Sequence, residues 1–109
     1  MCTSIVEIAA AEGMAKAGDD WFPVTHSVVA YDHARHALLG DVITLDFFNA
    51  GLPASSRAAV ELTLETAKAL RAALDRAIAA ADLEEAERAA SIAAQREAKR
   101  IRVAARAAA

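Results

Sequence analysis

The sequence contains few of the residue types, and none of the common motifs, that would indicate a particular class of function. Among 109 residues there are one cysteine, two prolines and four glycines, and only 5% of the residues are aromatic. A single cysteine excludes a disulfide within the chain. No apolar run approaches the roughly 20 residues that a membrane-spanning helix needs. The chain also has no glycine-rich phosphate loop, no Cys-x-x-Cys and no Gly-x-Ser-x-Gly, so no common catalytic signature assigns it an activity.

The charge and the N-terminal composition predict a cytoplasmic protein. The formal net charge of -3 gives no overall attraction to nucleic acid. The first residues lack the basic region and the apolar segment of a signal peptide, and the low cysteine content fits a reducing compartment. We therefore expect neither a membrane partner nor a dedicated nucleic-acid partner.

Alternation of apolar and polar residues predicts four β-strands. The expected strands are residues 1–8, 21–33, 41–50 and 57–63. Residues 11–20 are expected to form a loop, because they contain two glycines and an acidic pair. Ile43, Leu45 and Phe47 share one face of the third strand, and we expect that face to form the core.

From Thr63 the apolar period changes from that of a strand to that of a helix. Thr63 can cap the helix, and Glu65 in the first turn suits the positive end of the helix dipole. A single apolar stripe follows at spacings of three or four residues: Ala67, Leu70, Leu74 and Ile78.

Residues 82–109 continue the helical pattern with abundant alanine and few large apolar residues. Acidic residues come first in this segment and basic residues last, an order that complements a helix dipole. The predicted fold is therefore α+β: a four-stranded antiparallel meander with one packed helix, in a domain of residues 1–81, and an Ala-rich charged helical extension, residues 82–109. One helix covers only one face of a sheet, so we expect a homo-oligomer.

Several short motifs give the chain a family resemblance. It begins Met1-Cys2-Thr3, continues with Ile5-Val6-Glu7 and Asp20-Trp21-Phe22, and then has Asp32-His33-Ala34-Arg35-His36-Ala37. Over residues 1 to about 80 it resembles a family of small, uncharacterised bacterial proteins that begin Met-Cys-Thr and carry Asp-His-x-x-His-Ala. The chain departs from that pattern at Asp20, where the family has glycine. The resemblance implies no activity.

His33 and His36 are the first candidates for a metal site. Imidazole suits zinc, copper, nickel and iron, and thiolate suits the softer metals. The two histidines can share one ion if their loop turns back on itself, and Cys2, His26 and Asp32 are candidates to complete the site. Asp32 could instead orient one imidazole. One alternative is that the site binds a small molecule in place of a metal. Another is that the histidines are purely structural, above all His26, which lies in the middle of a strand.

Cys2 supports a second hypothesis, that the chain is an enzyme or sensor reacting with a small electrophile such as an aldehyde. If the initiator methionine is removed, Cys2 presents an amine and a thiol on adjacent carbons. This pair can chelate a metal, form a thiazolidine, or act as a nucleophile with its own amine as base, and a histidine is an alternative base. A small buried apolar side chain is the structural alternative for Cys2.

The C-terminal segment supports a third hypothesis, a structural oligomerisation module. Residues 88–109 carry six basic residues and one acidic residue. Basic side chains on a helix can contact phosphate, but no aromatic platform accompanies them, which argues against nucleic-acid binding. We expect this segment to pack on a partner chain or to be solvated.

Overall fold

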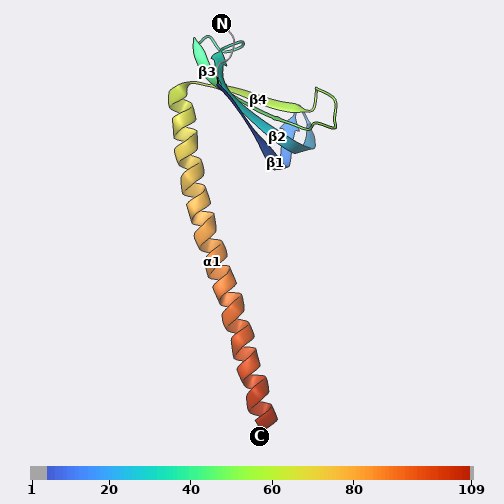
Figure 1. The fold of residues 1–109 in the computed structure, drawn as a ribbon, viewed down its shortest axis with the longest axis vertical. Coiled ribbons are helices and arrows are strands. Elements are labelled where there is room, and N and C mark those ends of the chain that lie inside the picture. The colour runs from blue at the N-terminus through green and yellow to red at the C-terminus, as the bar shows by residue number, and fades with distance from the viewer. Residues whose placement is uncertain (1–4, 109) are drawn as a thin grey trace. The chain divides into compact units, whose positions relative to one another are not determined.

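The computed structural model describes residues 5–108 and contains one sheet and one helix (Figure 1). The elements are β1 (Ile5–Ala17), β2 (Asp20–His33), β3 (Asp41–Phe48), β4 (Arg57–Leu62) and α1 (Leu64–Ala108). The strands lie in the order β1-β2-β3-β4, and each neighbouring pair is antiparallel. The predicted α+β class and the four-stranded antiparallel meander are therefore confirmed.

The first hairpin is longer than the sequence predicts. β1 continues to Ala17 through residues that we expected to form a loop. Its register with β2 shifts between Ala10 and Gly13, and this bulge accommodates the first glycine. The second, Gly18, has a φ of 62° and begins the two-residue turn between Ala17 and Asp20. A left-handed glycine at the first central position is typical of a type II′ hairpin turn. Both glycines therefore shape a hairpin and do not interrupt it.

The two faces of the sheet differ in composition. One face carries apolar side chains of β1 to β4, including Ile43, Leu45 and Phe47. We predicted these three as the core, but Ile43 and Leu45 are only half-buried and Phe47 is exposed. The buried apolar residues among those described are Phe22 and Val42, and Val42 lies on the opposite face. That face also carries Glu61, whereas His33 and Asp41 alternate onto the face of Ile43.

α1 begins as the sequence predicts. The main-chain N–H of Thr66 donates to Thr63 Oγ1 over 3.1 Å, and the N–H of Ala67 donates to the Thr63 carbonyl over 2.9 Å. Thr63 is therefore the N-cap, and it leaves fewer of the first-turn donors unsatisfied. Farther along, the helix runs without a break past residue 81, where we placed the start of the helical extension.

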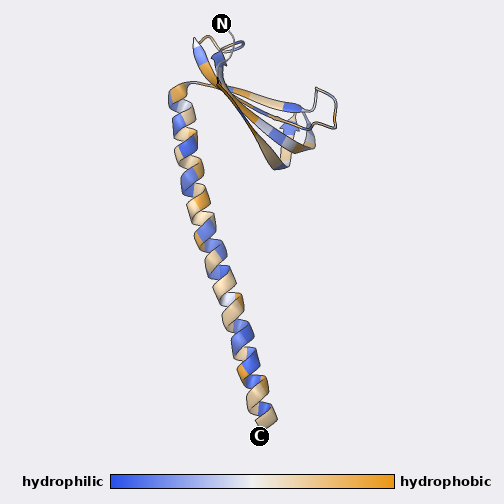
Figure 2. Ribbon diagram, viewed as in Figure 1, coloured by the Kyte–Doolittle hydropathy of each residue, from blue (hydrophilic) through white to orange (hydrophobic). Residues whose placement is uncertain are grey.

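The residues of α1 explain both its continuity and its surface. It contains neither glycine nor proline, and its many alanines favour helix throughout. Apolar and hydrophilic residues alternate around it without a sustained apolar stripe (Figure 2). No described residue of α1 is buried, and Leu74 and Ile78 of the predicted packing stripe are exposed. Within residues 5–108, no helix combines the length and the hydropathy needed to cross a membrane.

The chain divides into two compact units, residues 1–69 and residues 70–109. The first unit contains the whole sheet and the first residues of α1. The second consists of the rest of the helix. The predicted boundary between residues 81 and 82 lies within α1.

Candidate functional site

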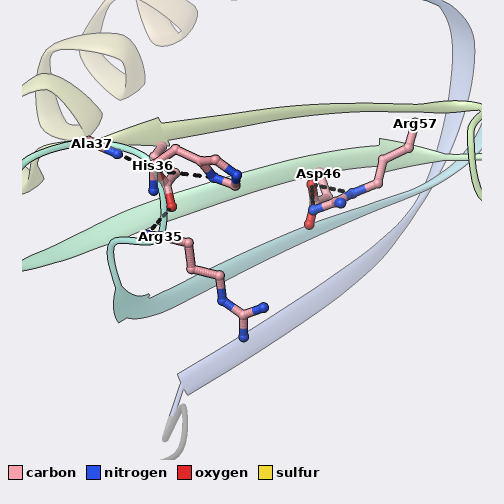
Figure 3. A network of polar contacts seen from close by, with 6 residues as sticks. Arg35, His36, Ala37, Asp46 and Arg57 are labelled. Atoms are coloured by element: carbon pink, nitrogen blue, oxygen red, sulfur yellow. Dashed lines mark hydrogen bonds and ion pairs between the residues drawn. The ribbon is translucent and has the colours of Figure 1, made fainter.

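The loop between β2 and β3 carries His36 and is held in place by one carboxylate of β4. Glu61 Oε2 accepts a hydrogen bond from the main-chain N–H of Arg35 over 2.7 Å. Glu61 Oε1 accepts two more, from the N–H groups of His36 and Ala37, each over 2.9 Å (Figure 3). Three consecutive amides of the loop therefore converge on a single side chain. We call this arrangement the Glu61 clamp.

The strand register explains why Glu61 meets this loop. Val6, Ala30, Thr44 and Glu61 form one row across the four strands and share a face of the sheet. The loop closes on itself through a 2.9 Å hydrogen bond from the N–H of Ala34 to the carbonyl of Gly40. Because Glu61 projects from that face, the clamp fixes the closed loop over the same side of the sheet.

The clamp also changes the acidity of Glu61. The N–H groups of Arg35 and Ala37, followed by that of His36, hold the pKa of the Glu61 carboxyl below its usual value. They do so because each hydrogen bond stabilises the charged form. The His36 ring, whose Nδ1 lies 3.8 Å from Glu61 Oε1, acts in the same direction when protonated. Glu61 is therefore an anion throughout the neutral range.

His33 is the last residue of β2 and lies opposite Asp41, the first residue of β3. Its Nδ1 lies 2.6 Å from Asp41 Oδ1, and the Tyr31 hydroxyl donates to Asp41 Oδ2 over 3.4 Å. A carboxylate beside Nδ1 favours the tautomer with its proton on that nitrogen. The lone pair is then on Nε2, which can bind a metal ion or accept a proton.

A hollow of about 740 Å³ lies on the face of the sheet that carries Ala30, Thr44 and Glu61. Its lining includes the small side chains Ala30, Thr44 and Ala59, and the loop residues Arg35 to Ala37. Small residues in the middle of the face, with a loop fixed at one end, leave room that larger side chains would fill. His33, Asp32 and Glu61 also line the hollow.

An ion pair marks another part of the hollow. The Arg57 Nε and Nη2 atoms lie 3.0 Å and 2.8 Å from Asp46 Oδ1, a contact between β4 and β3. The Arg35 guanidinium points away from the clamp (Figure 3). The hollow therefore offers charges of both signs around a floor of small side chains.

The structure brings some of the predicted site residues together and separates another. Asp32, His33 and His36 all line the hollow. Asp32 Oδ1 accepts a 2.7 Å hydrogen bond from the main-chain N–H of His33, while Asp41 is the carboxylate that contacts the imidazole. Cys2 lies outside the described residues, so its proposed chemistry stays a prediction.

His26 is the predicted site residue that lies apart. It precedes His33 by seven residues on β2, about 23 Å at roughly 3.3 Å per residue. Its ring stacks on Phe48 with 5.4 Å between centroids, and its Nδ1 lies 2.7 Å from Thr25 Oγ1. These contacts give His26 a structural role at the other end of β3. Between residues 5 and 108, no three His, Cys, Asp or Glu side chains are grouped closely enough to hold a metal ion.

Sequence reasoning missed Asp41 and Glu61. Asp41 could have been found, because the predicted strands end at His33 and begin again at Asp41, which makes the two residues cross-strand neighbours. Glu61 gives a weaker signal, an acidic residue within the last strand, and its partners depend on the conformation of the loop.

The comparisons with other proteins extend the resemblance found in the sequence. No curated protein and no solved structure matches the chain. Residues 1–88 match the model of DUF6295, which is described as a family of unknown function, and the match passes residue 81, where we expected the resemblance to end. It covers the whole sheet, the clamped loop and the first part of α1. The chain therefore belongs to the DUF6295 family.

Proposed function

We propose that this chain binds a small ligand at the hollow beside the Glu61 clamp, and that a transition metal ion is the first candidate. His33 and His36 supply imidazole groups, which suit zinc, copper, nickel and iron. Of the further ligands that the sequence predicts, Asp32 and Cys2 remain candidates, whereas His26 lies apart on β2. The site has His36 on a loop, His33 at the end of β2 and its floor on the sheet. Binding residues are commonly carried by loops on a rigid scaffold.

The main support for the proposal is the contact that holds the His33 ring against Asp41. Its Nδ1 lies 2.6 Å from Asp41 Oδ1, so its Nε2 is the nitrogen left with a lone pair. Histidines that bind metals commonly donate their other ring N–H to a carboxylate in this way. The same arrangement suits a base in proton transfer, which keeps an organic ligand as the alternative to a metal ion.

Preorganisation is the second line of support. The loop has no regular secondary structure between His33 and Asp41, yet three of its amides are bonded to Glu61. A loop held in this way loses less conformational freedom on binding than a free loop. Two histidines alone leave a zinc ion short of its usual four ligands, so Asp32, Cys2 or a bound molecule would complete the shell.

Calorimetric titration of the untagged protein with zinc, copper and nickel salts tests this proposal. We expect His33→Ala and His36→Ala each to weaken binding at least about tenfold, since each removes one ligand. His26→Ala is the matched control, because this histidine lies on the same strand but is stacked on Phe48. Equal affinities in all three variants, or no binding by the parent protein, would refute the metal site.

An oligomerisation module is a second candidate function, and the apolar face of the sheet favours it. Ile5, Phe47 and Val60 on this face are 54%, 37% and 46% exposed. Apolar patches of this kind commonly mark an interface, and we propose a second copy of the chain as the occupant, in a cytoplasmic homo-oligomer. Light scattering on Val60→Glu tests this candidate. We expect a smaller assembly, and an unchanged mass would contradict the proposal.

A further inference from the structure

The second half of α1 carries two blocks of opposite charge. The acidic block is Asp82, Glu84, Glu85 and Glu87, and the basic block is Arg96, Lys99, Arg100, Arg102 and Arg106. The sequence alone suggested that this order complements a helix dipole. That explanation fails for the acidic block, because α1 begins at Leu64 and the dipole acts mainly within the first and last turns.

Three residues of each block are related by inversion about Ile92. Counting outward from Ile92, Asp82 and Arg102 are equally distant, as are Glu84 and Arg100. Glu85 and Lys99 are a third such pair. Each pair joins an acidic residue to a basic one. They are too far apart to meet within one straight helix, since Asp82 and Arg102 are separated by about 30 Å at roughly 1.5 Å per residue.

In a two-fold interface between identical chains, residue i of one copy contacts residue j of the other, and residue j of the first copy contacts residue i of the second. The acidic and basic partners on either side of Ile92 can meet in this way. Two antiparallel copies of α1 that cross at Ile92 place each acidic block beside the partner's basic block. A parallel pair would place like charges together. We propose that residues 81–103 of α1 form an antiparallel helix pair with a second copy of this chain.

The apolar residues of this segment fit the same geometry. Ala81, Ile92 and Val103 are spaced 11 residues apart, which is close to three helical turns, so they lie on one face. In the antiparallel pair Ile92 faces its own copy, and Ala81 faces Val103. Ile92 and Val103 are 43% and 56% exposed and therefore accessible to a partner.

The geometry also contains two like-charge pairs. Arg88 and Arg96 are equally distant from Ile92, as are Glu87 and Glu97, so each pair would lie at the same level of the helix pair. Arg88 Nη2 lies 3.8 Å from Glu84 Oε1 of its own helix, which partly offsets the repulsion. Every pair occurs twice in a symmetric dimer, so the three complementary pairs outnumber the two like-charge pairs.

Disulfide trapping in the full-length chain tests the proposal in a Cys2→Ser background, which removes the only native cysteine. We expect mixed Ala81→Cys and Val103→Cys proteins to form a cross-linked heterodimer, because a disulfide needs Cα atoms about 4.4–6.8 Å apart. Ala81→Cys alone should stay uncross-linked. Cross-linking of Ala81→Cys to itself would show a parallel pair, and no heterodimer in the mixture would equally overturn the proposal.

Charge reversal gives an independent test. One variant carries Asp82→Lys, Glu84→Lys and Glu85→Lys, and the other carries Lys99→Glu, Arg100→Glu and Arg102→Glu. We expect each reversal, introduced into both cysteine proteins, to abolish their cross-link, and mixing the two oppositely charged chains to restore it. The restored cross-link should weaken as salt shortens the Debye length from about 30 Å to about 3 Å. Unchanged cross-linking in either reversed variant would contradict the charge pairing, whatever happens at the sheet or the histidine site.

Discussion

Replacing Glu61 tests how the histidine loop is held. In the structure Glu61 Oε2 accepts from one amide and Oε1 from two. Glu61→Ala removes all three acceptor contacts. Glu61→Gln keeps the shape but replaces one oxygen with an NH₂ group, which donates and cannot accept. The glutamine variant can therefore retain at most the two bonds that share an oxygen.

Amide hydrogen exchange followed by NMR measures this effect residue by residue. We expect Arg35, His36 and Ala37 to lose protection together in Glu61→Ala, and at least one of them to lose it in Glu61→Gln. Protection of the β2–β3 ladder should persist, because its bonds do not involve this side chain. Glu7→Gln on β1 is the control and should change none of the three amides. Unchanged protection in Glu61→Ala would refute the clamp.

The clamp also has a predictable pH dependence. Because the hydrogen bonds lower the pKa of Glu61, their contribution is fully present above the ordinary glutamate pKa of about 4.3. It is lost only as the pH falls through the lower pKa of the folded state. NMR titration of the Glu61 carboxyl carbon should show a midpoint below the ordinary glutamate pKa of about 4.3, and a midpoint at or above that value would contradict the contacts.

Two further predictions concern the fold. Val42→Ala should destabilise the protein by about 2–3 kcal/mol in denaturant unfolding, because Val42 is fully buried, whereas the exposed Val6→Ala should cost less than about 1 kcal/mol. Equal effects would contradict the assigned core. Gly18→Ala should cost about 1 kcal/mol, because Gly18 has a φ of 62° although its surroundings are open. Gly40→Ala, also in open space, should be close to neutral, and the reverse order would contradict the turn geometry.

Much of the fold could be predicted from the sequence because its strands and helix have local sequence patterns. The alternation in β3 and the change of period at Thr63 depend only on neighbouring residues, and both predictions agree with the structure. The prediction of a loop at residues 11–20 was wrong because it left out tertiary contacts. Pairing with β2 stabilises an extended chain through Gly13, whereas composition alone favours a turn.

The site was harder to predict than the fold. Asp32, His33 and His36 were recognised by residue type and spacing, and all three line one hollow. Glu61 was missed because its partners are main-chain amides 24 to 26 residues away, and amides carry no side-chain signature. His26 was grouped with the other histidines by type, although strand geometry places it far along β2.

Native mass spectrometry of the untagged chain, purified without a chelator and then equilibrated with zinc, is the most direct test of the metal site. We expect a mass increment that disappears in acid and is absent from His33→Ala and His36→Ala but retained in His26→Ala. A parent protein that shows only its own polypeptide mass, both as purified and with zinc, would contradict a metal site at His33 and His36.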